Sequence, residues 1–560
     1  MTKPQKHHAI VLFVWFRLIL IPLCAGLITG CGQESTPRPR PGGVLLTPPL
    51  EFPLNGLDPA VVNHSCDDVL AQQLFDGLLQ YRPVTFELVP ALAEKWETPD
   101  SGRTWIFHLR PNAFFNDDAC FADGHGRAVT VEDVKYSLER IITWRENETT
   151  WRVFADIDGA EEFRQGRTPT LRGLRVRDNA TVQIILTRAS FQFLHRLASS
   201  KGYVVPHEAI EKYGERFRLH PVGTGPFRLA KLELNQQEII LVRNERYWEV
   251  DSRGVRLPYV SAIRWVPVEL INDEISIPKL SGQIIACVPA WAKSWLARIE
   301  AYNRQQPAAR RLHLVKTPIA NTIFFAFRMD ANTPYARNKW LRQAVACAFD
   351  MKSAMTDSLQ VTLAQSLIPP GLFGYHSPVA GYRFNLQKAA ALLQAAGFPN
   401  SQNLPALRLN TVEGTGPFYK KFRDDLASLG IPLEVEFLPK PEHFAGAAAG
   451  KWDFFRAGWI CDYPDALDLF QLFYSHSPNN HSRYQNPEYD RLFEQASREM
   501  RREQRLRLFE KMEKILHEDC PAIYMLHEIH AVAIPAWVRN LEWSINPVRM
   551  RFLKYVWLDS

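Results

Sequence analysis

Hydrophobic residues along the chain follow two spacings, which predict a mixture of strands and helices. Alternating residues predict a strand over residues 104–110, and apolar or β-branched runs predict strands over residues 44–50, 181–186 and 238–242 and after Pro521. Apolar residues at helical spacing predict helices over residues 67–79, 130–142, 338–349, 385–396 and 503–517. Residues 90–96 are predicted as a short helix or a turn. No repeat of fixed period is visible, so the predicted fold class is α+β (mixed α/β), with more than one lobe.

Residues at the predicted helix ends support these assignments. Thr130 and Asp133 resemble a capping box in which Asp replaces the usual Glu. Asn385 suits the start of the helix over 385–396, and Gly397 and Pro399 suit its end. These two helices are therefore bounded by signals that are independent of their apolar faces.

Length and composition limit the class of protein. A chain of 560 residues exceeds what one hydrophobic core holds, about 250–300 residues, so two or three lobes are expected. Hydrophobic residues make up 46% and charged residues 22%, which excludes a disordered chain, a coiled coil and a polytopic membrane protein. The formal net charge of +6 is nearly neutral at this length, and it argues against a nucleic-acid partner.

The N-terminal segment has the pattern of an export signal. Lys3, Lys6 and Arg17 precede an apolar stretch over residues 18–30, which is shorter than the roughly 20 residues that span a bilayer. Residues 27–31, LITGC, resemble the bacterial lipobox, and this resemblance implies that Cys31 carries the lipid and becomes the mature N-terminus. The alternative is an uncleaved anchor in which the cysteine is incidental.

The segment after Cys31 has the composition of a tether. Residues 32–43, GQESTPRPRPGG, are rich in proline, glycine and polar residues. Removal of residues 1–30 takes away three positive charges and lowers the net charge from +6 to +3. Two or more acyl chains would hold the protein stably at a membrane face.

Eight cysteines are present, at positions 24, 31, 66, 120, 287, 347, 461 and 520. None forms a CxxC pair, which disfavours zinc ribbons and thioredoxin-type redox sites. Export permits disulfides, and a Cys66–Cys120 bridge is one possibility. Free buried thiols are the alternative.

Motifs for catalysis or metal binding are weak. The chain has no G-x-S-x-G sequence, and Gly223-Thr-Gly225 has neither the length nor the lysine of a phosphate-binding loop. His527 and His530 have a spacing that binds metals on a helix, but they lie in a predicted strand, where i and i+3 face opposite sides. We therefore expect no enzyme, no cofactor and no metal site.

One segment carries more specific chemistry. Residues 453–465, DFFRAGWICDYPD, place Asp462 after a glycine-containing strand and before a Tyr-Pro-Asp turn. A carboxylate at a strand end, flanked by Trp459 and Tyr463, suits the capture of a primary ammonium group.

This segment and several others resemble the oligopeptide- and dipeptide-binding proteins of bacterial ABC importers, the family 5 (cluster C) solute-binding proteins. The matching pieces occur in the family's order and cover essentially residues 44–560. They are NGLDP at 55–59, QLFDGL at 73–78, PALAEKW at 90–96, residues 105–112 and 129–140, VGTGPF at 222–227, RNERYW at 243–248, residues 341–350 and 389–399, NPEYD at 486–490 and the helix over 503–517.

The resemblance implies a role for individual residues. It assigns Asp462 to the free α-amino group of a peptide and Gly458 to backbone hydrogen bonds with an extended ligand. Arg456 matches an arginine that meets the carboxylate of short peptides in some members, and Trp459 matches an aromatic pocket wall. The binding residues implied together are Asp462, Arg456, Gly458, Trp459 and Cys461 from one lobe and Ser65, next to Asn63 and His64, from the other.

The sequence departs from the family at three places. Asn63 replaces an acid, residues 411–420 offer no counterpart of a histidine that some members use, and the loop over 117–127 is longer. Structural roles remain open beside the binding roles. Asp462 could cap the turn, Arg456 could face solvent or pair with an acid, and Trp459 could be part of the core. Gly223 and Gly225 are expected to serve the backbone alone.

The resemblance also implies a fold and a function. The fold would be periplasmic-binding-protein type II-like, with two lobes, a hinge and an extra N-terminal subdomain. Its expected segments are the signal peptide (1–30), the tether (31–43), lobe I (44–62, 216–312 and 531–560), the N-terminal subdomain (63–215) and lobe II (313–530).

The expected function is that of a lipid-anchored, exported, monomeric peptide receptor. Its expected partners are an ABC permease with ATPase subunits. The alternatives are a non-peptide solute (an oligosaccharide, metal chelate or opine), or a tethered enzyme or sensor that reuses the fold.

Overall fold

The computed structural model describes residues 38–47, 54–62, 65–233, 238–265, 288–289, 294–354, 361–375, 381–413, 416–544 and 552–559. The predicted signal peptide, Cys31, most of the tether, Asn63, His64 and Cys287 lie outside these ranges. In the described part of the chain, no helix has both the length and the apolar character needed to cross a membrane.

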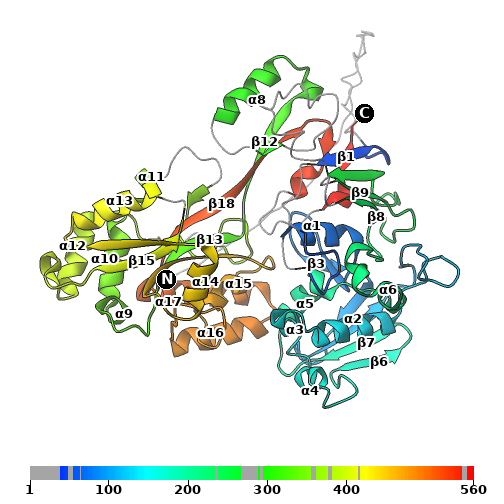
Figure 1. Ribbon diagram of the computed structural model, residues 1–560, viewed down its shortest axis with the longest axis horizontal. Coiled ribbons are helices and arrows are strands. Elements are labelled where there is room, and N and C mark those ends of the chain that lie inside the picture. Colours follow the sequence, from blue (N-terminus) through cyan, green and yellow to red (C-terminus); the bar gives the residue numbers. More distant parts are fainter. Residues whose placement is uncertain are drawn as a thin grey trace, which may run out of the picture. The chain divides into compact units, whose positions relative to one another are not determined.

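The N-terminal part contains a four-stranded sheet that joins distant segments of the chain. Its order is β1 (Val44–Thr47), β10 (Ala262–Trp265), β9 (Glu238–Arg243) and β8 (Phe227–Glu233). β1 pairs in parallel with β10, and the other neighbours are antiparallel. The C-terminal strands β19 (Val538–Arg539) and β20 (Trp557–Leu558) pack into the same hydrophobic core (Figure 1).

A second four-stranded sheet is formed by β4 (Ala93–Glu97), β5 (Thr104–Leu109), β7 (Thr181–Ile185) and β6 (Leu174–Asp178), in that order. β2 (Leu79–Tyr81) and β3 (Leu88–Pro90) form a separate pair. The helices of this part are α1 (Ser65–Leu74), α2 (Val131–Thr143), α3 (Glu148–Arg152), α4 (Ala160–Arg164), α5 (Gln192–Leu197) and α6 (His207–Tyr213). Thr130 and Asp133 form the predicted capping box of α2.

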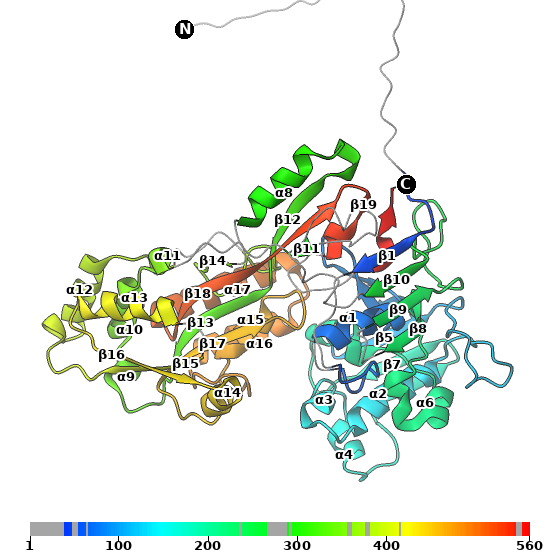
Figure 2. The ribbon, with the colours of Figure 1, turned by 45° about the horizontal axis from the view of Figure 1, so that its top comes forward.

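The remaining strands form a mixed sheet that carries the candidate site. Its order is β11 (Val288–Pro289), β18 (Ala522–Pro535), β13 (Asn321–Phe327), β17 (Phe454–Ile460), β15 (Leu407–Val412) and β16 (Leu433–Leu438) (Figure 2). β12 (Leu312–Pro318) and β14 (Val361–Leu363) also pair with β18.

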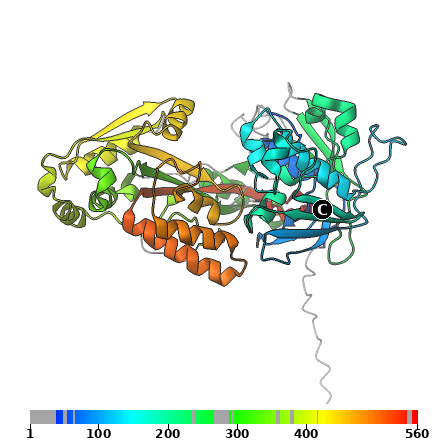
Figure 3. The same cartoon turned by 90° about the horizontal axis from the view of Figure 1, so that it is seen from below.

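Helices cover both faces of this sheet. Alternate residues of β13 enter two different cores, since Phe324 and Ala326 belong to one and Phe325 and Phe327 to the other. The first core is closed by α14 (Lys440–Ala448), α15 (Leu467–Phe470), α16 (Pro487–Arg498) and α17 (Arg502–Asp519); α16 and α17 are the orange helices of Figure 3. The second is closed by α10 (Lys339–Ala348), α12 (Leu386–Ala395) and α13 (Gly416–Ala427).

The long strand β18 contributes to every one of these cores. Val532 and Ile534 pack with the N-terminal part, whereas Ala522 and Ile523 pack on the two faces of the mixed sheet. β12 runs antiparallel beside β18 from Leu312 to Pro318. β12 and β18 thus connect the N-terminal part with the mixed sheet, close to the predicted boundary at residue 312. The full set of predicted domain boundaries remains a proposal.

Most predicted elements are present, but two predictions are wrong. The helix over 67–79 begins at Ser65 and already ends at Leu74. Residues 90–96 are the end of β3, a two-residue bend and most of β4 rather than a helix or turn, because β4 pairs with β5 and thereby places Trp96 opposite Phe107. Partners outside the segment decide both cases: the turn at residues 223–225 for α1 and the next strand, β5, for β4.

The end of α1 is set by the Gly223-Thr-Gly225 turn. The Gly225 N–H donates to the Leu74 carbonyl (3.0 Å), and the Asp76 N–H donates to Thr224 Oγ1 (3.2 Å). A Cβ atom on Gly225 would lie 2.4 Å from the Leu74 carbonyl carbon. The glycines therefore permit a close backbone approach, as the sequence predicts for them.

The cysteine alternatives are partly resolved. Cys120 carries a free thiol, so the Cys66–Cys120 bridge is not formed. Burial and the neighbouring Asp118 raise the pKa of Cys120 to about 12. The thiol therefore remains protonated and unreactive at neutral pH.

Candidate functional site

β17 has an incompletely paired edge. On one side it pairs with β13 along its whole length, from Asn321 opposite Ile460 to Phe327 opposite Phe454. On the other side it pairs in parallel with β15, at Phe454 and Phe455 alone. Among the described strands, none pairs with residues 456–460 on that second side.

The backbone of β17 presents hydrogen-bonding groups at this open edge. The Cys461 N–H donates to the Ala320 carbonyl (2.7 Å), and hydrogen-bonded pairs alternate along an antiparallel ladder. The N–H and C=O groups of Gly458 and Ile460 therefore point away from β13, and both residues are exposed. Farther back, the Arg456 carbonyl pairs with His443 Nε2 (2.7 Å). The edge thus offers an extended chain a short strand to pair with.

The turn after β17 is held by a buried carboxylate that the sequence analysis missed. Asp468 Oδ2 accepts the Asp462 N–H (2.7 Å) and the Trp459 indole N–H (3.0 Å), and its Oδ1 accepts Gln471 Nε2 (2.6 Å). Asp468 is fully buried. It therefore ties the end of β17 to the start of the following helix.

A buried ion pair holds the same turn from a second side. Arg505 Nη1 and Nη2 lie 2.5 and 2.8 Å from the two carboxylate oxygens of Asp465. Asp465 Oδ1 also accepts the Leu467 N–H (3.0 Å). The turn therefore depends on Asp465 and Asp468, rather than on the Asp462 carboxylate that could have capped it.

The Asp462 carboxylate remains available. Its residue is exposed, yet surrounding protein removes enough water to raise the pKa of Asp462 to about 6, and Asp68 adds like-charge repulsion. No Lys, Arg or His side chain in the described ranges forms an ion pair with it. A partly desolvated carboxylate without an ion-pair partner is stabilised in its charged form by a cation that also donates hydrogen bonds to it.

The other predicted residues are placed as follows. Trp459 is half-buried with its indole N–H on Asp468, so its ring orientation is fixed. Cys461 is buried, and burial raises the pKa of its thiol. Arg456 is half-buried in β17, and Ser65 is the first residue of α1. The structure brings the β17 residues together, whereas the Ser65 contribution remains a prediction.

Contacts from the N-terminal part reach the turn. The His195 ring stacks on the Tyr463 ring with 5.0 Å between centroids, and the Phe191 N–H donates to the Ser497 carbonyl (3.1 Å). His195, like Asp468, Arg505 and Asp68, is not among the residues that the sequence predicts for the site. The only local signal was a series of acids at 462, 465 and 468.

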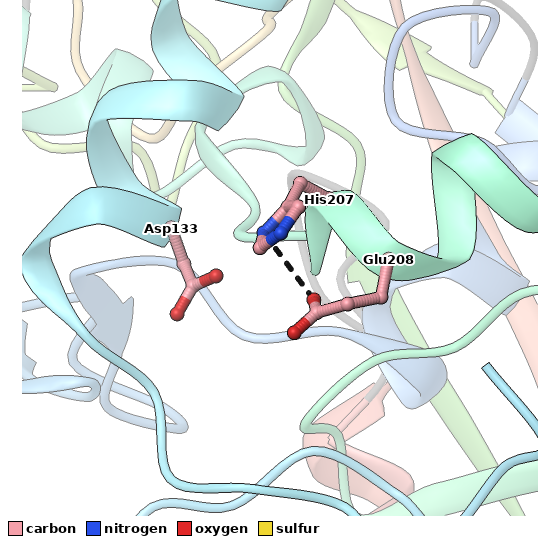
Figure 4. Close-up of side chains that lie close together, drawn as sticks. All are labelled: Asp133, His207 and Glu208. Atoms are coloured by element: carbon pink, nitrogen blue, oxygen red, sulfur yellow. Dashed lines mark ion pairs between the residues drawn. The ribbon is translucent and has the colours of Figure 1, made fainter. Parts of the chain in front are cut away.

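One cluster has the residue types of a metal site. Asp133, His207 and Glu208 lie close together in Figure 4, with His207 Nδ1 3.3 Å from Glu208. Arg127 lies between the two acids and donates to both carboxylates of Asp133 and Glu208 at 2.6 to 2.8 Å. A guanidinium group therefore already pairs with both acids, and the cluster is explained as an ion-pair network.

Comparison with known proteins identifies the family. The profile of the bacterial extracellular solute-binding proteins, family 5 (Middle), matches residues 87–481. The chain belongs to this family. The family consists of solute-binding proteins rather than enzymes, and its extracellular character supports export of this chain.

Individual relatives agree with this assignment. The chain is 28% identical over 505 residues to "Peptide transport periplasmic protein SapA" of Salmonella typhimurium, with 85% of each chain covered. It is 24% identical over 480 residues to "Dipeptide-binding protein" of Escherichia coli, covering 82% of this chain and 84% of that protein.

A solved structure shows the fold. The DppA periplasmic binding protein of Helicobacter pylori, in complex with the peptide STSA, superposes with a TM-score of 0.69 at 20% identity. The match covers 93% of this chain and 99% of that one. The chain therefore has the predicted mixed α/β, type II periplasmic-binding-protein fold.

Proposed function

We propose that this protein is an extracytoplasmic receptor that binds a peptide in extended form along the open edge of β17 and delivers it to an ABC importer. The observation that carries the proposal is the combination of a short unpaired strand edge with an accessible acid, Asp462, at its end. Two relatives are described as peptide-transport and dipeptide-binding proteins, and one similar fold holds a peptide.

The peptide backbone would add to the sheet as a further strand. Gly458 and Ile460 would exchange hydrogen bonds with it, because their backbone groups face the open edge. Such main-chain bonds are independent of the side chains of the ligand. The receptor would therefore accept peptides of varied sequence.

The ends of the peptide would meet charged groups. Asp462 would bind the α-ammonium group, and that ion pair would replace the repulsion from Asp68. Arg456 would approach the carboxylate of a short peptide, and Trp459 would form an aromatic wall. Cys461 would support the strand end without touching the ligand, because its thiol is buried and its backbone N–H is bound to the Ala320 carbonyl. Ser65 would contribute from the other lobe.

The remaining expectations belong to the same proposal. Cys31 would carry the lipid that holds the receptor at a membrane, and residues 32–43 would act as the tether. The receptor would act as a monomer, and lobes I and II would close on the ligand with the boundaries given above. Its partners would be the permease and ATPase subunits of the importer.

Native mass spectrometry of the mature protein, purified without unfolding, tests the function. A series of short co-purifying peptides is the expected result. A single non-peptide mass, or no gain in binding from a free amino group, would contradict the proposal. The second comparison uses trialanine and N-acetyl-trialanine in calorimetric titrations, and trialanine should bind at least about tenfold more tightly.

A further inference from the structure

The turn from Asp462 to Asp468 carries three carboxylates with three different partners. Asp465 pairs with the buried Arg505 guanidinium, and Asp462 is exposed without a cation among the described residues. Asp468 is buried and meets N–H donors from a backbone amide, an indole and a side-chain amide. Its surroundings therefore differ from those of an acid that binds a ligand directly.

A single oxygen atom of Asp468 joins two ligand-facing residues. Oδ2 accepts both the Asp462 N–H (2.7 Å) and the Trp459 indole N–H (3.0 Å). These residues lie on either side of the end of β17, since the strand ends at Ile460. The bridge thus fixes the backbone that carries the acid relative to the plane of the aromatic ring.

The position of Asp468 is itself fixed. Its Oδ1 accepts Gln471 Nε2 (2.6 Å), and Gln471 Oε1 in turn accepts Asn479 Nδ2 (3.2 Å). Asp468 also lies within α15, whose residues are all buried. Because Gln471 holds Oδ1 of Asp468 in place, Oδ2 can hold the Asp462 N–H and the Trp459 indole N–H at fixed positions.

We propose that Asp468 is a positioning residue of the ligand site: through one oxygen it sets the place of Asp462 and the orientation of Trp459 before a ligand arrives. This inference rests on the proposed function, because it names the groups that the ligand meets. It assigns Asp468 no contact with the ligand. Its contribution to binding is preorganisation, which lowers the cost of ordering the site.

The test compares Asp468→Ala with Asp468→Asn and with a control, Asp425→Ala. Asp425 is a buried carboxylate in the same lobe that accepts a backbone N–H, from Asp350 at 3.0 Å, but it lies on α13 and away from β17. It reports what the loss of a buried acid does to the lobe in general. Asparagine keeps an acceptor oxygen and the shape of the side chain, so it should restore the bridge.

Two readouts are needed. The first is fluorine NMR of the ligand-free protein labelled with 5-fluorotryptophan, in which Trp459→Phe identifies the Trp459 resonance. The second is the affinity for trialanine. Asp468→Ala should move or broaden the Trp459 resonance and weaken binding by about 5- to 100-fold, since the two hydrogen bonds that hold Asp462 and Trp459 are lost. Asp468→Asn should stay near wild type in both readouts. Asp425→Ala should leave the Trp459 resonance in place and change the affinity for trialanine by no more than about twofold.

The outcomes separate this inference from the proposed function. An unchanged Trp459 resonance in Asp468→Ala, or an affinity loss equal to that of Asp425→Ala, would overturn the positioning role. If wild type binds no trialanine, the peptide proposal fails, while the Trp459 resonance in ligand-free protein still decides the role of Asp468. If Asp468→Ala does not fold, Gln471→Leu, which removes the support at Oδ1, should also broaden that resonance, and no broadening would count against the proposal.

Discussion

The imidazole ring of His195 stacks on the phenol ring of Tyr463, with 5.0 Å between ring centroids and 19° between the ring planes. His195 also lies against Tyr81, with 5.8 Å between ring centroids, and the Tyr81 hydroxyl is 2.8 Å from His195 Nδ1. Tyr463 directly follows Asp462 in the chain. A residue of the predicted N-terminal subdomain thus contacts the turn that carries the proposed ammonium acceptor.

This contact predicts a dependence of stability on pH. The pKa of His195 is lowered from 6.5 to about 4: burial is the main cause, Asp465 opposes it, and Arg505 and Arg196 add to it. The unfolded chain therefore binds a proton between pH 6.5 and 4 that the folded protein does not bind. The free energy of unfolding should fall by roughly 3 kcal/mol over this interval because of His195 alone.

His195→Phe isolates this contribution, because phenylalanine keeps the ring contact and does not titrate. Urea denaturation at pH 6.5 and pH 4.5 should show a smaller loss of stability for this variant than for wild type. A change at the exposed His313, such as His313→Gln, should leave the wild-type loss in place. Equal losses for wild type and His195→Phe would contradict the prediction.

Asp462→Asn should abolish the preference for a free amino group. If the ammonium pairs with this carboxylate, the substitution should cost about 2–5 kcal/mol of affinity for trialanine and little for N-acetyl-trialanine. Isothermal titration calorimetry gives both values. Asp453→Asn is the matched control, since Asp453 is an exposed acid at the opposite end of the same strand. An unchanged affinity in Asp462→Asn would remove Asp462 from the site.

The Asp465–Arg505 pair should matter for stability. Arg505→Met leaves a buried carboxylate without its cation and should lower the free energy of unfolding by about 3–5 kcal/mol. Adding Asp465→Asn to this variant should recover part of the loss. Arg491→Met, which breaks an exposed pair with Glu488, should cost at most about 1 kcal/mol in the same urea titration. Similar losses at the two sites would refute a special role for the buried pair.

Gly225 and Gly458 should respond differently to alanine. A Cβ on Gly225 would collide with the backbone of Leu74, so Gly225→Ala should destabilise the protein by about 1–3 kcal/mol or more. A Cβ on Gly458 meets its nearest atom, the Thr322 carbonyl oxygen, at 3.4 Å, an ordinary contact. Gly458→Ala should therefore keep its melting temperature and weaken trialanine binding, because it adds a methyl group to the strand, β17, that is proposed to pair with the ligand. Unchanged binding would argue against that strand.

Cys31→Ser should release the protein from membranes. The lipobox resemblance makes Cys31 the acceptor of the lipid, so the variant should appear in the soluble fraction and should not incorporate radiolabelled palmitate. Cys24→Ser, within the apolar stretch, is the control and should remain membrane-bound. Retention of label by Cys31→Ser would show that this cysteine is not the lipid site.

The sequence predicts those elements whose signals are local. Thr130 with Asp133 and Asn385 with Gly397 mark helix ends that the structure confirms. The end of α1 and the strand β4 were not predictable in this way, because residues outside each segment determine them: Gly225, far along the chain, for α1, and Phe107 in the next strand for β4. In the site, the family resemblance pointed to Asp462 and Trp459. The role of Asp468 depends on hydrogen bonds that only the folded turn creates.

If Asp462 binds the ammonium group as proposed, its raised pKa would make ligand capture an exchange of cations. With a pKa of about 6, the carboxylate of the empty receptor would be partly protonated near that pH, and an incoming ammonium group would have to displace the proton. Below that pH the apparent affinity for peptides should decline by up to about tenfold per pH unit, with a proton released for each peptide bound. Outside the cytoplasm, where pH follows the surroundings, acidification alone would thus unload the receptor.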